Sequence, residues 1–218
     1  MRYFFICPRF LLFFPIFALR HDMTDDFTDI HTHRFTGRLT ELRAAGIHPW
    51  RAAEPHVESL LVPELFEGAQ AVGETGLDFA CGVDREAQER LFRLQLEIAE
   101  RRRMPVVIHC VRAFEPTMKV LAEYSPAAVI FHGFIGSPQM ARRAVDKGYY
   151  LSFGVMTPRS PKTVAALRST PAERLFAETD DSGADIGRVY DMIAEIRGME
   201  IGDLKRAINE NYERIFRR

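Results

Sequence analysis

Short apolar runs recur along this chain, and the stretches between them are long enough for a helix. The clearest runs cover residues 104–109, 127–132, 149–153 and 174–180. Continuous apolar runs of this length are typical of strands buried on both faces of a parallel sheet. Further strands are expected just before His31, just before His48 and over residues 70–78. The pattern therefore predicts about seven strands.

The intervening stretches carry helical spacing. Asp84 is an N-cap residue for a helix that runs to Arg103, and its apolar positions recur at spacings of four, three and four residues: Ala87, Leu91, Leu94 and Ile98. Other helices are expected over 118–124, 137–148 and 163–168, with a short helix or turn at 60–66. Two helices follow the last strand. The first ends at Gly198, and the second carries one apolar stripe: Leu204, Ile208, Tyr212 and Ile215.

Repeated strand–helix units predict an α/β fold, with a parallel sheet and helices outside it. A chain of 218 residues suits a single TIM-like (β/α) barrel. Only twelve residues, 34–45, separate His33 from Gly46, which is too few for another strand–helix unit. We therefore expect seven strands rather than eight. The strands ending at His31 and His48 should then be adjacent and parallel, or residues 34–45 should plug the opening, because exposed edges leave backbone groups unpaired.

Residues 1–22 differ from the rest of the chain. They are rich in Phe, Leu and Ile but are interrupted by Pro8, Arg9 and Pro15, and no small-residue cleavage site follows. This pattern is poor both as a signal peptide and as a membrane-spanning helix, although a targeting or anchoring segment stays open. We favour Met23 as the true start, with residues 1–22 an apolar extension outside the fold and residues 23–218 a single domain.

Composition narrows the classes of function. A formal net charge of −1 excludes a strongly basic protein that coats nucleic acid. Cys7, Cys81 and Cys110 are odd in number and widely spaced, which argues against a disulfide framework and indicates a reducing, cytoplasmic location.

Polar residues with metal-binding side chains stand at the carboxyl ends of at least five predicted strands. They are His31, His33, His48, Glu74, His109, His132 and Asp180. Side chains alternate along an extended chain, so His31 and His33 should share a face with Asp29 and can close on one metal ion. One such histidine is more often a buried core residue or part of a surface turn. Five strand ends of this kind indicate a site at the rim of a barrel.

Seven short motifs occur in a fixed order: D-I-H-T-H, G-I-H-P, G-E-T-G-L-D, P-V-V-I-H, F-H-G-F-I-G, S-F-G and E-T-D. Together with the ending N-Y-E-R-I-F at 211–216, they resemble the TatD-type metal-dependent hydrolases, a family of amidohydrolase-like barrels. The resemblance covers about residues 27–217.

The resemblance implies two divalent metal ions, Mg, Mn or Zn. By this resemblance His31 and His33 hold one ion with Glu74 and Asp180. Glu74 bridges to a second ion, which His109 and His132 complete. Asp180 also accepts the proton of the attacking water. His48 and Arg112 are placed at the substrate, with ordinary surface charge as the alternative for Arg112.

The sequence departs from the family pattern in the short 34–45 connection, in Thr75 and in Asp181-Ser182 after Asp180. These departures leave the ligand set intact and bear on the substrate, because rim loops set specificity. The leading hypothesis is a TatD-like deoxyribonuclease that cleaves phosphodiester bonds in DNA and needs no obligate protein partner or membrane. The alternatives are a metal-dependent amide, ester or lactone hydrolase and a non-catalytic metal-binding protein.

Overall fold

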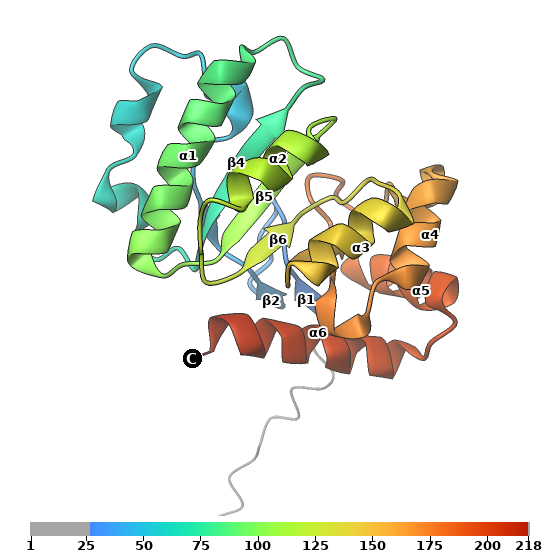
Figure 1. Cartoon of the computed structure of the whole chain (residues 1–218). Helices are drawn as coiled ribbons and strands as arrows, with labels where there is room; N and C mark the ends of the chain where they lie inside the picture. Colours follow the sequence, from blue (N-terminus) through green and yellow to red (C-terminus); the bar gives the residue numbers. More distant parts are fainter. Residues whose placement is uncertain (1–26, 218) are drawn as a thin grey trace, which may run out of the picture.

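The computed structural model describes residues 27–217 (Figure 1). Six parallel strands form one continuous sheet in chain order: β3 (Ala44–Ala45), β4 (Ala71–Asp78), β5 (Val106–Val111), β6 (Val129–Phe131), β7 (Tyr150–Phe153) and β8 (Leu175–Ala177). β1 (Thr28–Asp29) and β2 (Thr40–Glu41) form a separate parallel pair. The predicted α/β class with parallel strands is confirmed.

Hydrogen bonds outside these two sheets close them into a ring. Only Leu42 and Arg43 separate β2 from β3, so residues 40–45 form one segment that pairs first with β1 and then with β4. On the other side of β1, the Ile30 amide donates to the Ala177 carbonyl at 3.1 Å, and Thr32 forms a parallel bridge with Asp180. With residues 40–45 taken as one strand, the described residues form a barrel of seven strands.

The expected contact between the His31 and His48 strands is confirmed. Thr28 lies opposite Thr40 and Asp29 opposite Glu41, in parallel register. Residues 30–39, which connect the two strands, contain no helix. The barrel therefore closes across the shortened connection without an exposed strand edge at this place.

Six helices cover the described part of the barrel: α1 (Arg85–Arg102), α2 (Phe114–Leu121), α3 (Pro138–Asp146), α4 (Pro161–Ser169), α5 (Ile186–Arg197) and α6 (Ile201–Phe216). The predicted caps are present, since the Asp84 carboxylate accepts from the Ala87 amide at 2.8 Å and the Ser137 hydroxyl accepts from the Met140 amide at 3.3 Å. Among residues 27–217 no helix combines the length and apolarity needed to span a membrane.

Some boundaries differ from prediction. α2 begins at Phe114, four residues before the expected start. The expected helix at 60–66 is two short 3-10 helices, Val57–Leu60 and Pro63–Phe66. β8 ends at Ala177 rather than Asp180, and Asp180 itself has a left-handed backbone (φ 53°). The predicted apolar extension, residues 1–22, lies outside the described residues.

Helix α6 covers the end of the barrel at which the strands begin; Figure 1 shows it crossing below β1 and β2. Its predicted stripe is buried. The fully buried Asn211 amide donates to the carbonyls of Ala172 and Leu175, at 2.8 and 2.9 Å. The Tyr212 hydroxyl accepts from the Gln70 amide, just before β4, at 2.8 Å. The N-Y-E-R-I-F ending is thus explained by contacts with strand starts, and the opposite end of the barrel is left for a site.

Asn211→Ala is expected to lower the free energy of unfolding by about 2 kcal/mol, because two buried carbonyls lose their donor. Urea denaturation of the full chain measures this loss. Glu210→Ala, at an exposed position of the same helix, is the control and should change stability by less than about 0.5 kcal/mol. Equal stability of the two variants would mean that Asn211 does not hold α6 against β8.

Candidate metal centre

The carboxyl ends of the strands bring six of the predicted side chains around one carboxylate, that of Glu74 in β4. The six are the five imidazoles at positions 31, 33, 48, 109 and 132 and the carboxylate of Asp180. They come from the ends of five different strands or from the residues directly after them. The prediction that strand ends place these residues together agrees with this geometry.

The two oxygens of Glu74 face different histidines. Oε1 lies 3.1 Å from Nε2 of His31 and 3.0 Å from Nε2 of His33. Oε2 lies 2.8 Å from Nε2 of His132 and 3.4 Å from Nδ1 of His109. One carboxylate therefore separates two groups of imidazoles, with one oxygen directed to each.

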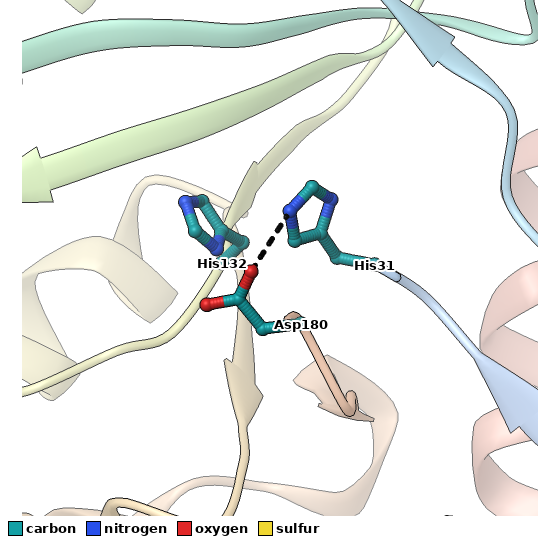
Figure 2. A group of neighbouring side chains, drawn as sticks. All are labelled: His31, His132 and Asp180. Carbon is teal, nitrogen blue, oxygen red and sulfur yellow. Dashed lines mark ion pairs between the residues drawn. The ribbon is translucent and has the colours of Figure 1, made fainter. Parts of the chain in front are cut away.

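Asp180 completes the first of these groups. Its Oδ1 lies 3.6 Å from Nε2 of His31 and 3.4 Å from Nε2 of His33. Figure 2 shows its carboxylate between His31 and His132. The Asp180 amide donates to the His31 carbonyl at 2.9 Å, and the His33 amide donates to the Asp180 carbonyl at 3.2 Å. These backbone bonds hold Asp180 in register with the two histidines.

Asp29 does not join the centre, although alternation predicts it in the same row as His31 and His33. Its carboxylate instead accepts from the amide of Thr179 at 3.1 Å and from the Thr179 hydroxyl at 2.6 Å. Burial raises the pKa of Asp29 to about 6, against the opposing effect of these hydrogen bonds. Asp29 thus fixes the β1 end against the Asp180 segment.

Two further carboxylates, which the sequence reading left without a role, lie behind the histidines. Oδ2 of Asp78 is 3.3 Å from Nε2 of His109, and Oε1 of Glu178 is 3.7 Å from Nδ1 of His132. Both carboxylates are nearly inaccessible to solvent. Carboxylates behind metal-binding imidazoles orient the rings and raise their basicity. The alternation of side chains along a strand could have predicted these two carboxylates, because Asp78 is four residues after Glu74 and Glu178 is two residues before Asp180.

Gly76 allows β4 to approach β5 at the centre. Its φ is +142°, and a Cβ there would lie 2.1 Å from the His109 carbonyl oxygen. No side chain fits in that space, so any other residue would push β4 away from β5. The glycine between Glu74 and Asp78 therefore keeps both carboxylates within reach of His109.

The charges of the centre are coupled. Burial disfavours the imidazolium of His31, yet Asp180 and Glu74 outweigh it and raise its pKa to about 9. His132 is still more buried, and Glu178 and Glu74 raise its pKa to about 10. Burial would raise the pKa of Glu74, but the histidines His109, His132 and His31 lower it well below its usual range. His48 behaves oppositely, because burial and the neighbouring His109 lower its pKa to about 4.

The donor set fits divalent cations. Nε2 of His31 is buried and makes no hydrogen bond, although Glu74 Oε1 is 3.1 Å away. A buried ring nitrogen without a hydrogen bond, beside a carboxylate oxygen, suits a metal ligand. Three groups have ligand atoms close enough to hold one ion: His31, His33 and Glu74; His31, His132 and Asp180; and His48, Glu74 and His109. Imidazole suits Zn²⁺ or Mn²⁺, and carboxylate suits Mg²⁺ or Mn²⁺.

The two residues predicted at the substrate have different positions. His48 lies inside the centre, with Nε2 3.8 Å from Oε2 of Glu74. Arg112 is exposed, follows β5 with a left-handed backbone (φ 52°) and lines a cavity of ≈ 560 Å³ that His132 also borders. A second cavity, of ≈ 780 Å³, is bordered by His109, His132 and Asp180. A substrate can therefore reach the centre from the β5–β8 side.

A barrel with a carboxylate shared between histidine groups at its rim defines the class of metal-dependent hydrolases. The profile of the TatD related DNase family matches residues 36–217, and this chain belongs to that family. The match begins just after the His31-Thr32-His33 motif.

Named relatives share this class. The chain is 31% identical over 195 residues to a Bacillus subtilis (strain 168) protein named uncharacterized metal-dependent hydrolase YabD, covering 80% of this chain and 76% of YabD. It is 24% identical over 212 residues to human deoxyribonuclease TATDN3, covering 85% of this chain and 77% of TATDN3. The crystal structure of YjjV, a TatD homologue from Escherichia coli K12, superposes with a TM-score of 0.71 at 28% identity, covering 82% of this chain and 78% of YjjV.

Metal affinity should rise with pH. His31 and His132 have raised pKa values of about 9 and about 10, so both are protonated at neutral pH and must lose protons to bind a cation. Titration calorimetry with Mn²⁺ between about pH 6.5 and 8.5 should show an affinity increase of about tenfold per pH unit for each proton released. The exposed His56 supplies the control, since His56→Ala should keep the full pH dependence. An affinity independent of pH would contradict the charged state of these histidines.

Proposed function

We propose that this protein is a deoxyribonuclease that hydrolyses phosphodiester bonds in DNA with two divalent metal ions. The observation that carries the proposal is the position of Glu74, whose two carboxylate oxygens face separate histidine groups. Paired cations joined by a carboxylate suit in-line displacement at phosphorus. The name of the human relative, deoxyribonuclease, supports the choice of DNA.

In this proposal His31 and His33 would hold one cation with Glu74 and Asp180. His109 and His132 would hold the other with Glu74. His48 joins the second group as a further ligand candidate, because it shares a possible ion position with Glu74 and His109. When bound, the cations neutralise charge on the phosphodiester and lower the pKa of a water molecule toward neutrality.

Asp180 is our candidate for the group that takes the proton of the attacking water. In the protein without metal the interaction with His31 lowers the pKa of this carboxylate, and a bound cation would likewise favour its ionised form near neutral pH. Its side chain is 46% exposed and borders the larger cavity, where water and substrate can enter. An ionised, accessible carboxylate beside the cations can accept a proton as the water attacks.

The remaining residues position the reacting groups. Asp78 lies within hydrogen-bond distance of His109, and Glu178 lies 3.7 Å behind the His132 ring. Arg112, at the mouth of the smaller cavity, is a candidate contact for a phosphate further along the DNA. The small net charge of the chain means that such contacts must be local.

Incubation of the purified full chain with labelled single-stranded DNA and Mg²⁺ or Mn²⁺ tests the proposal. Cleavage that depends on the cation and stops with a chelator is the expected result. Turnover of small ester or amide substrates without DNA cleavage would contradict the proposed phosphodiesterase activity and indicate another class of hydrolase. Two bound ions with no turnover of any substrate would indicate a metal-binding protein.

Asp180→Asn should lower kcat by about 10²–10⁴-fold, the usual contribution of a positioned proton acceptor. The amide keeps the size of the side chain, so circular dichroism should show the same fold. Asp191→Asn, an exposed position on α5, makes the same chemical change away from the centre and should retain activity. Near wild-type kcat in the Asp180 variant would remove Asp180 from the mechanism.

Metal counting should separate the bridging residue from a residue of one group. Glu74→Gln removes a charge that both histidine groups share, so both ions should be lost together. His132→Ala removes a side chain whose shortest contact with Glu74 is to Oε2, so mainly one ion should be lost. Elemental analysis after dialysis gives the ratio of metal to protein. Equal losses in both variants would show that Glu74 does not bridge two sites.

A further inference from the structure

Trp50 is the single tryptophan of the chain and stands beside the proposed metal centre. It lies in the 3-10 helix η1 (Pro49–Arg51), two residues after His48. With 60% of its surface exposed, it is the most exposed large apolar side chain among residues 27–217. Isolated exposed apolar residues are common, so exposure alone gives it no role.

The indole is nevertheless held firmly at one edge. Its Nε1 donates a hydrogen bond of 2.6 Å to Oδ2 of Asp78, which is 3% exposed and also faces His109. The His48 ring packs against it edge to face, with ring centroids 4.7 Å apart and planes at 81°. The His109 ring centroid is 6.3 Å away. One edge of the indole is thus fixed by the centre while much of its surface faces solvent.

We propose that Trp50 is a substrate-binding residue that stacks against a nucleobase of the nucleic acid whose phosphate lies at the centre. This inference rests on the proposed function. An aromatic ring that is already fixed loses little conformational entropy on binding, and stacking accepts any base because every base has a π face. Because the Trp50 ring centroid is 6.3 Å from that of His109, the stacked base belongs to the scissile nucleotide or to a near neighbour.

The indole and the larger cavity lie on different sides of His109. That cavity is bordered by His109 and by residues of the β6–β8 ends, whereas Trp50 follows β3 and contacts β4 through Asp78. A nucleic-acid strand that crosses the centre can therefore place one base on Trp50 while the chain continues into the cavity. Trp50 would then set the position of the strand relative to the scissile phosphate.

A different explanation is that the indole serves only as a hydrogen-bond donor to Asp78. Trp50→Phe separates the two roles, because phenylalanine keeps an aromatic face but cannot donate to Asp78. Trp50→Ala removes both. Leu60→Ala is the control, since Leu60 is also an exposed apolar residue in a neighbouring 3-10 helix and is 43% exposed.

Tryptophan fluorescence reports directly on this residue. The full chain with Mg²⁺ is titrated with an eight-residue thymidine oligonucleotide and with an abasic oligomer of the same length. Saturable quenching by the thymidine oligonucleotide, absent with the abasic oligomer, is expected. Cleavage of the oligonucleotide is followed in the same samples.

Cleavage without quenching would overturn stacking and leave the nuclease function intact. Quenching without cleavage would support stacking and count against the nuclease function. If neither quenching nor cleavage is observed, both the stacking role and the nuclease function are rejected.

Steady-state kinetics and metal content complete the test. Trp50→Ala should raise KM for the oligonucleotide by about tenfold, the loss of one base-stacking contact, with a smaller effect on kcat and on metal content. Trp50→Phe should restore most of the affinity, and Leu60→Ala should match the wild type. If both Trp50 variants instead lower kcat and lose metal equally, the indole acts only through Asp78 and His109, and the stacking role is wrong.

Discussion

The hydrogen bonds on the two sides of β1 connect the closure of the barrel to the assembly of its centre. β1 has two residues, yet it lies between residues 40–42 on one side and residues 177–180 on the other. Bonds from Ile30 and to His31 join it to the end of β8. Because His31 and Asp180 are partners in these backbone bonds, closing the ring also places their side chains together. A break in this contact would open two strand edges and separate the proposed ligands at once.

The electrostatics of the centre follow from burying one carboxylate among several imidazoles. Removing Glu74 from water is costly unless opposite charge or hydrogen bonds compensate. In the protein alone, protonated His31 and His132 supply that charge, which is why their pKa values are raised. Divalent cations bound by neutral imidazoles would supply the same positive charge to Glu74. The same geometry therefore suits protons or metal, and the two must compete.

Support behind the histidines is divided between two buried carboxylates. Glu178 faces His132, while Asp78 faces His109 and accepts from the Trp50 indole. Gly76 makes the Asp78 side possible by letting β4 and β5 come into close contact. The centre is thereby rigid at its back, on strands, and accessible at the front, where Asp180 borders the larger cavity. This division suits a site that must keep its geometry while exchanging substrate.

Patterns along the chain are enough to predict the parallel α/β barrel, the helix caps and the residues that gather at the strand ends. These features depend on local periodicity and on the rule that parallel strands end at one rim, which needs no knowledge of the pairing. Long-range packing sets the direction in which each carboxylate side chain points. Asp29 was expected beside the histidines but bonds to Thr179, whereas Asp78 and Glu178 turn toward the histidines. It also decided that Trp50 lies beside His48 and His109. Such choices depend on strand register and on partners more than a hundred residues away, as for Asp29 and Thr179, and no local pattern of the chain records them.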